Sequence, residues 1–144
     1  MPYDPAMVRP MKEEVTRLGA KQLATAAEVD KFFAEKKGTA FLFINSVCGC
    51  AAGGARPALR IALANDHLPD RIGTVFAGQD VEATSRARAA FADYPPSSPS
   101  AALLKDGEVV FFLPRHEIEG RDPASIAHTI VQAFDEHCAL AKKA

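Results

Sequence analysis

The chain has 144 residues, 48% of them hydrophobic and 24% charged, and a formal net charge of −1. A chain of this length and balance is expected to fold as one soluble domain, with a core large enough to need no disulfide staples. Because lysine and arginine are spread along the sequence rather than clustered, we expect neither nucleic acid nor a membrane surface among its partners.

The first residues of the chain and the number of cysteines indicate the cellular compartment in which the protein is expected to work. No apolar run approaches the roughly 18 residues of a membrane helix, and residues 1–14 mix proline with charged side chains, unlike a signal peptide. The expected localisation is therefore cytoplasmic, where structural disulfides are rare. The chain has three cysteines, an odd number that a closed disulfide framework would not use. Closely spaced cysteines then indicate catalysis or metal binding.

The first half of the sequence alternates between helix and strand patterns. Thr25 and Glu28 form a capping box that begins a helix. The run 39–45 is continuously apolar, which is typical of a central strand buried on both faces. In chain order we expect a helix over 5–19, a short strand within 20–25, a helix over 25–38, a strand over 39–45 and a helix over 51–64.

The second half continues the alternation and then changes to a hairpin. A turn rich in proline and serine at 95–99 precedes two strands that are joined by residues 105–107. Helix and strand alternation followed by a hairpin predicts an α/β fold, with a mixed central β-sheet flanked by helices on both faces. The expected elements are a strand over 71–77, a helix over 80–91, strands over 100–104 and 108–113, and a last helix from 122 onward.

Cys48 and Cys50 lie where the buried strand ends and the next helix begins. If Cys48 is the helix N-cap, its sulfur faces unpaired backbone N–H groups of the first turn, including that of Cys50. These donors and the positive end of the helix dipole stabilise a thiolate. The pKa of Cys48 is thus expected to fall toward neutrality without help from a cation. This position predicts redox chemistry.

Two other interpretations of the cysteine pair remain open. The cysteines could be buried and inert, or they could bind a metal. A zinc site would need two further ligands, for example Cys138 with one of the histidines at 67, 116, 128 and 137. Nothing in the sequence brings the C-terminal end to the motif, so we expect no metal there.

The segment around Pro99 resembles thioredoxins. Ser98-Pro99-Ser100 is followed by a strand that ends in the run KDGE at 105–108, as in the thioredoxin segment where a cis-proline begins a strand and a hairpin follows it. The resemblance implies a cis peptide bond before Pro99. It also implies that this loop lies against the active-site cysteine and pairs with the substrate backbone, with Ser98 facing the sulfur.

A second resemblance covers almost the whole chain, up to Cys138. The sequence is similar to the bacilliredoxin family in five segments: NSVCGCAAG at 45–53, VFAGQD at 75–80, PSSPS at 96–100, PRHEIEG at 114–120 and FDEHC at 134–138. The resemblance implies a single thioredoxin-like domain over 1–144. In it, residues 1–24 form an N-terminal extension made of the first helix and the first short strand.

The bacilliredoxin resemblance also implies a reaction. The chain would remove bacillithiol from mixed disulfides on S-thiolated proteins, with Cys48 as the attacking thiol and Cys50 as its neighbour or resolving cysteine. Gly49, Ser98 and Pro99 would bind the substrate. No cofactor is implied apart from bacillithiol as the low-molecular-weight thiol co-substrate. The competing functions are a general disulfide isomerase or oxidant, and a non-catalytic metal- or partner-binding module on the same fold.

Two features speak against resolution by Cys50 in the manner of thioredoxin. Leu42 stands six residues before Cys48, where thioredoxins usually carry a buried acid that helps to deprotonate the second cysteine. In addition, residues i and i+2 of a helix point to nearly opposite sides, so the side chains of Cys48 and Cys50 are expected to diverge. A disulfide between them would then require unwinding of the first turn.

Three further groups of residues have both a structural and a functional interpretation. Residues 115–117 (RHE) could bind the carboxylates of a small thiol or hold a loop by ion pairs, and the second interpretation is favoured. Gln79 and Asp80 are expected to cap the next helix rather than to contact substrate. Cys138 is expected on the core side of the last helix.

Overall fold

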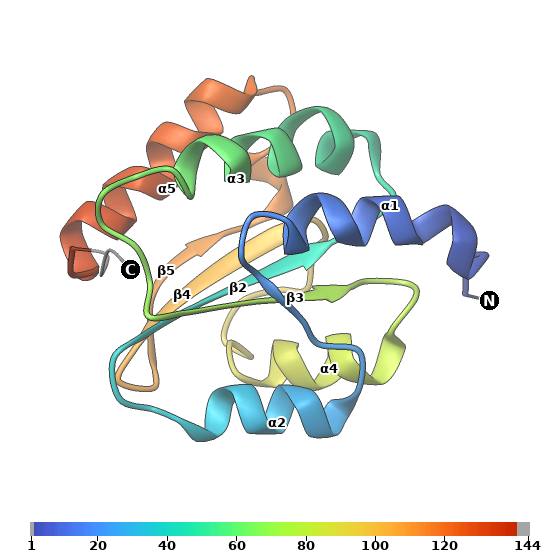
Figure 1. Cartoon of the computed structure of the whole chain (residues 1–144), viewed down its shortest axis with the longest axis horizontal. Coiled ribbons are helices and arrows are strands. Elements are labelled where there is room, and N and C mark those ends of the chain that lie inside the picture. Colours follow the sequence, from blue (N-terminus) through green and yellow to red (C-terminus); the bar gives the residue numbers. More distant parts are fainter. Residues whose placement is uncertain (1, 141–144) are drawn as a thin grey trace.

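β2 (Thr39–Asn45) lies in the middle of the sheet, and all seven of its residues are buried. In the computed structural model, which describes residues 2–140, it pairs in parallel with β3 (Arg71–Phe76) and antiparallel with β4 (Ser100–Lys105). The edges are β1 (Lys21–Gln22) and β5 (Glu108–Leu113), in the order β1-β3-β2-β4-β5 (Figure 1). The mixed sheet confirms the predicted α/β class.

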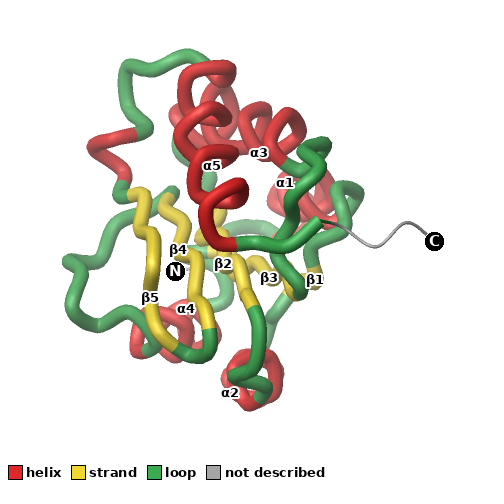
Figure 2. Tube along the Cα trace, turned by 90° about the vertical axis from the view of Figure 1, so that its left-hand side faces the viewer, coloured by secondary structure: helices red, strands yellow, loops and turns green. Residues whose placement is uncertain are grey.

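Helices cover both faces of this sheet, as Figures 1 and 2 show from two sides. One face carries three of them, α1 (Pro5–Thr16), α3 (Arg56–Ala62) and α5 (Pro123–His137). The other face carries α2 (Ala26–Ala34) and α4 (Val81–Ala89). Within residues 2–140, no helix has the length and apolar character needed to cross a membrane.

The two faces of β2 build separate cores. Phe41 and Phe43 pack with α3 and α5, whereas Leu42 and Ile44 pack on the side of α2 and α4. This division follows from the strand geometry, because successive side chains point to opposite faces. The ring of Phe41 also makes an edge contact with Phe134 of α5, with 5.3 Å between the ring centroids. A strand covered on both sides explains the continuous apolar run in the sequence.

The first two helices end earlier than the sequence predicts. α1 stops at Thr16 and α2 at Ala34. Gly19 and Gly38, which were expected to close these helices, lie in the turns that follow and have φ of 105° and 85°. Glycine adopts such positive φ without steric cost, so the chain can reverse toward the next strand at both points.

The helix after the cysteines begins with a wider turn than expected. Helical conformation starts at Gly49, η1 (Ala51–Ala55) is a π-helical turn, and α3 ends at Ala62 rather than at 64. Pro57 accounts for the wide turn. It has no N–H to donate to the carbonyl of Gly53, and its ring would clash with that carbonyl in a regular α-helix.

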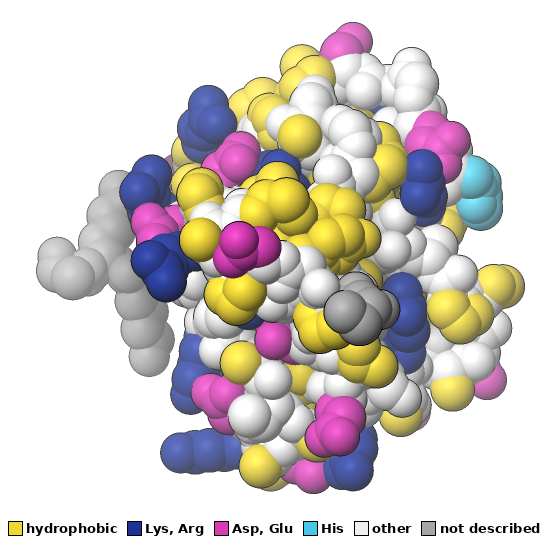
Figure 3. Space-filling model, turned by 90° about the vertical axis from the view of Figure 1, so that its right-hand side faces the viewer, with side chains coloured by type: hydrophobic (Ala, Val, Ile, Leu, Met, Phe, Trp, Pro, Cys, Tyr) yellow, Lys and Arg dark blue, Asp and Glu magenta, His cyan; other side chains and the backbone are white. Residues whose placement is uncertain are grey.

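Strand register brings several loops to one end of the sheet. Ser100 begins β4 opposite Ile44, and Phe76 ends β3 opposite Asn45. Because β5 ends beside the start of β4, its following segment arrives at the same end. Figure 3 views the molecule from this end, and hydrophobic side chains gather across the middle of the face. The segments that meet there are 46–50, 77–80, 95–99 and 114–119.

Candidate active site

The sulfur atoms of Cys48 and Cys50 lie 2.9 Å apart, and both residues are free thiols that are half-buried. The expectation that their side chains diverge is therefore wrong. Cys48 sits in a bend before the helix, which begins at Gly49, so the spacing of side chains on a regular helix does not apply to it. Its side chain turns over the first helical turn toward Cys50, while Gly49 between them is exposed.

The two thiols differ in acidity. The pKa of Cys48 is lowered, first by the hydrogen bond that the Cys50 thiol donates and then by the backbone N–H of Cys50. The positive charge of Arg115 and the N–H of Ala51 lower it further. The pKa of Cys50 is raised, first by burial and then because it donates to Cys48 and faces its negative charge. The arrangement favours a thiolate on Cys48 and a thiol on Cys50.

This asymmetry agrees with the N-cap argument in part. Backbone N–H groups of the first turn do stabilise the Cys48 thiolate, as the sequence predicts. The sequence did not predict two of the groups that lower the pKa of Cys48. The thiol of Cys50 has the largest effect on this pKa, and the guanidinium of Arg115 lowers it further. The catalytic roles of Cys48 and Cys50 stay predictions.

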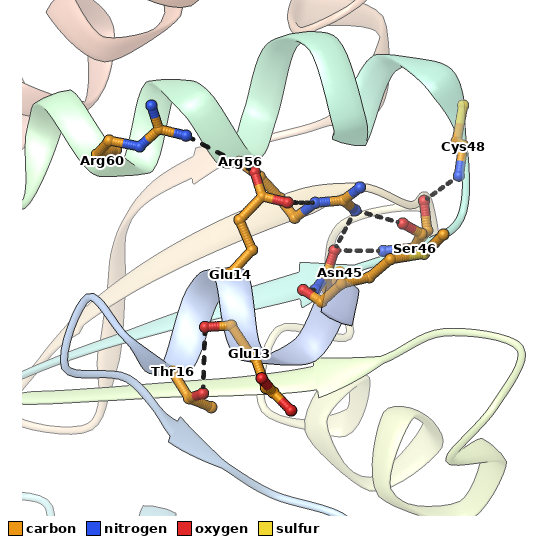
Figure 4. A network of polar contacts seen from close by, with 9 residues as sticks. Glu13, Glu14, Thr16, Asn45, Ser46, Cys48, Arg56 and Arg60 are labelled. Atoms are coloured by element: carbon orange, nitrogen blue, oxygen red, sulfur yellow. Dashed lines mark hydrogen bonds and ion pairs between the residues drawn. The ribbon is translucent and has the colours of Figure 1, made fainter. Parts of the chain in front are cut away.

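Beneath the cysteines, a network of polar contacts holds the end of β2 (Figure 4). Arg56 of α3 is only 3% exposed, and its Nη1 donates to Asn45 Oδ1 at 2.9 Å and to the Ser46 carbonyl at 2.8 Å. Its Nε donates to Glu14 of α1 at 3.0 Å. Ser46 Oγ in turn accepts the backbone N–H of Cys48 at 3.2 Å. The network thus connects α1 and α3 to the backbone of the motif.

The loop before β4 lies beside the motif. The Ser98-Pro99 peptide bond is cis, which confirms the prediction, and Pro99 is buried. Ser100, the next residue, pairs with Ile44 of β2, close to where the cysteine segment begins. Ser98 is half-buried. The roles of Gly49, Ser98 and Pro99 in substrate binding stay predictions.

Arg115 begins η2 (Arg115–Glu117), directly after β5. Its Nε donates to the carboxylate of Glu119, and its Nη1 donates to the Ser98 carbonyl at 3.3 Å. Arg115 thus forms an ion pair, as the favoured interpretation expects, and its hydrogen bond to Ser98 joins this segment to the loop before β4. The same guanidinium also acts on both sulfurs, which no local sequence pattern indicated.

Gln79 and Asp80 hold the N-terminal segment rather than capping α4 through their side chains. Gln79 Oε1 accepts the backbone N–H of Tyr3 at 2.7 Å, and Asp80 forms an ion pair with Lys12 of α1, also at 2.7 Å. Asp80 does occupy the N-cap position, but its carboxylate makes no capping hydrogen bond. The ammonium of Lys12 takes the place of the backbone donors as its partner.

Cys138 lies at the far end of the fold from the motif. It follows the last residue of α5 and is 7% exposed in the core between the sheet and that helix, so the predicted burial is confirmed. Burial raises the pKa of its thiol, and the side chain of Thr39 lowers it in part. Thr39 begins β2 and the motif follows its end, about 20 Å away at ~3.3 Å per residue. Cys138 therefore cannot join Cys48 and Cys50 in a metal site. Among residues 2–140, no group of three or more His, Cys, Asp or Glu side chains could hold a metal ion.

Comparison with known proteins adds to this geometry. A family model described as disulphide isomerase matches residues 3–138. Bacilliredoxin ABC2045 of Shouchella clausii is 54% identical over 136 residues, covering 94% of each chain. Bacilliredoxin GK1781 of Geobacillus kaustophilus is 50% identical over 137 residues, again covering 94% of each chain. The chain belongs to the bacilliredoxin family. It is a thiol–disulfide oxidoreductase, as its resemblance to that family implied.

Solved structures confirm the thioredoxin-like fold. Thioredoxin of Fasciola hepatica is similar with a TM-score of 0.53 and 19% sequence identity, over 81% of this chain and 98% of that one. Thioredoxin of Malassezia sympodialis is similar with a TM-score of 0.52 and 15% identity, over 78% and 89%. At such identities the likeness concerns the fold alone. The family assignment rests on the bacilliredoxins.

Proposed function

We propose that this chain removes bacillithiol from mixed disulfides on protein cysteines, with Cys48 as the attacking thiolate. One observation carries the proposal. The sulfur of Cys48 lies at the end of a buried strand, 2.9 Å from the Cys50 thiol that stabilises its negative charge, in a chain of the bacilliredoxin family. Such a reaction suits a reducing compartment, and we place the chain in the cytoplasm.

The first step is a thiol–disulfide exchange. The Cys48 thiolate attacks the bacillithiol sulfur of the mixed disulfide, and a new S–S bond forms between Cys48 and bacillithiol. The old S–S bond breaks, and the protein cysteine leaves as a thiolate that takes a proton from water. The number of disulfide bonds is unchanged, so this step needs no oxidant or reductant.

The second step removes bacillithiol from Cys48. Either the Cys50 thiolate attacks the Cys48 sulfur, which forms the Cys48–Cys50 disulfide and releases bacillithiol as a thiolate, or a second small thiolate attacks the bacillithiol sulfur, which forms a disulfide between the two small thiols and restores the Cys48 thiolate. The sulfur of Cys50 is within reach, but its raised pKa keeps it protonated near neutral pH. We therefore propose that an external thiol competes effectively with Cys50 in this step.

A general disulfide isomerase is the second candidate, since the matching family model bears that description. Such an enzyme would act on disulfides between two protein cysteines as readily as on small-thiol adducts. A scrambled disulfide protein, assayed beside the adduct, separates the two functions.

The proposal is tested with a protein that carries bacillithiol on its one cysteine, followed by mass spectrometry. We expect wild type to release the adduct and to carry its mass on Cys48, and Cys48→Ser to be inactive. Cys138→Ala is the matched control and should act like wild type, because Cys138 is buried at the opposite end of β2. Adduct mass on Cys50, or release by Cys48→Ser, would contradict the proposal.

A further inference from the structure

Both the backbone and the side chain of Arg115 are hydrogen-bonded to the loop beside the candidate site. Its backbone N–H donates to Ser97 Oγ at 3.2 Å, and its Nη1 reaches the carbonyl of Ser98, the residue before cis-Pro99. β5, which ends just before it, pairs with β4, and β4 pairs with the strand that leads to the cysteines. The guanidinium thus lies on the same loop cluster as the two sulfurs, and its charge acts on both of them.

The guanidinium of Arg115 is only partly used by the protein. Its five N–H groups form a planar fork. Within residues 2–140, its side chain donates through Nε to Glu119 and through Nη1 to Ser98, while Nη2 has no hydrogen-bond partner. The side chain is 43% exposed. A cation with unused donors, open to solvent and next to a thiolate, is suited to bind an anionic group of a substrate.

We propose that Arg115 binds a carboxylate of the small-thiol half of the mixed disulfide and so selects low-molecular-weight thiols that carry carboxylates. This inference rests on the proposed function. Bacillithiol and glutathione both belong to this chemical class. A carboxylate held by Arg115 places the sulfur of the small thiol, rather than the protein sulfur, next to Cys48. Attack then forms the bond between Cys48 and the small thiol, and the protein thiolate leaves.

Glu119 holds Arg115 while no substrate is bound. Their ion pair is exposed on both sides, with Glu119 at 53%, and exposed pairs contribute little to stability. The pair therefore offers slight resistance to a substrate carboxylate that approaches the unused edge of the guanidinium. The negative charge of Glu119 also repels that carboxylate, so its removal should strengthen substrate binding.

The test uses one target protein whose single cysteine carries bacillithiol, 3-mercaptopropionate or 2-mercaptoethanol. The last adduct has no carboxylate and reports any general loss of Cys48 reactivity. We expect Arg115→Gln to lower kcat/KM for the first two adducts about tenfold more than for the third, mainly through KM. Arg115→Lys should retain part of the preference, because it keeps the charge and loses the fork. Glu119→Gln should lower KM for the carboxylate adducts.

Arg86→Gln is the matched control. It removes an arginine that pairs with Asp30 between α4 and α2, away from the cysteines, and should leave the preference unchanged. An equal loss on all three adducts in Arg115→Gln, or no loss on any, would overturn the assignment of Arg115 while leaving the proposed function intact. A wild-type protein that releases none of the three adducts would overturn the proposed function itself. Equal thermal unfolding midpoints of Arg115→Gln and wild type exclude misfolding as the cause.

Discussion

The guanidinium of Arg56 and the carboxylate of Glu14 lie 3.0 Å apart beneath the cysteine segment, and they join α3 to α1. Arg56 is 3% exposed and Glu14 is 34% exposed, so the charge of Arg56 is buried and its partner faces solvent on one side. The same guanidinium bonds to Asn45 and Ser46 at the end of β2. The N-terminal helix is therefore part of the support of the candidate site.

Arg56→Met should lower the free energy of unfolding and the reactivity of Cys48 together. Breaking a buried ion pair costs roughly 3–5 kcal/mol, and we expect about 2–3 kcal/mol here because Glu14 is partly solvated. Urea unfolding measures the loss, and iodoacetamide measures the reactivity. Glu14→Gln is the milder comparison, with a loss below about 1.5 kcal/mol, since Arg56 keeps its other two partners. A wild-type unfolding curve for Arg56→Met would contradict this account.

The two cysteines of the motif should be alkylated at different pH. The pKa of Cys48 is lowered, so its thiolate persists to a lower pH than that of an ordinary cysteine, and the rate falls only as the pH drops below that lowered pKa. Cys50 has a raised pKa and should react only at higher pH. Iodoacetamide labelling followed by peptide mapping gives both profiles. Faster labelling of Cys50 than of Cys48 at neutral pH would reverse the assigned roles.

Replacing Cys50 should move the reactivity profile of Cys48 toward higher pH. The Cys50 thiol is the largest of the groups that lower the pKa of Cys48, and Cys50→Ala removes it. Cys50→Ser keeps a hydrogen-bond donor, so its profile should lie between those of Cys50→Ala and wild type. If Cys50→Ala and wild type have the same profile, the backbone donors and Arg115 are sufficient to stabilise the thiolate.

Cys50→Ala should also retain substantial release of bacillithiol when a small thiol is supplied. The reason is not the distance between the two sulfurs, which is only 2.9 Å. It is that the raised pKa of Cys50 limits its thiolate near neutral pH, so that an external thiol can clear the Cys48 adduct. Multiple-turnover assays with and without added thiol check this. Complete loss of turnover with thiol present would show that Cys50 is obligatory.

Cys138→Ala should affect stability and not activity. The residue is 7% exposed in the core, and its replacement leaves a small cavity worth about 1 kcal/mol of unfolding free energy. Release of bacillithiol at a temperature well below the unfolding midpoint should equal that of wild type. A loss of activity larger than the loss of folded protein would assign Cys138 a role in the chemistry.

Much of the fold was predictable because it follows from sequence patterns that span only a few neighbouring residues. The apolar run at 39–45, the N-cap at Thr25 and the hairpin at 105–107 each depend on neighbours a few residues away, and each forms as predicted. Only the return contact of the capping box differs, because Glu28 accepts the backbone N–H of Ala24 rather than that of Thr25. The position of the cysteines after a buried strand, and the cis peptide bond before Pro99, follow from the same kind of pattern combined with the family resemblance.

The details of the site were decided by tertiary structure. Glu14 and Arg56 are 42 positions apart, and Arg115 comes from a strand that reaches the cysteines only because β5 pairs with β4. No periodicity in a sequence encodes such distant contacts. The short distance between the two sulfurs could likewise not be predicted from the sequence, because it depends on whether the regular helix includes Cys48 or begins one residue later. The sequence alone therefore determined the fold and the position of the candidate site, while packing between distant segments determined which charges and donors surround its sulfurs.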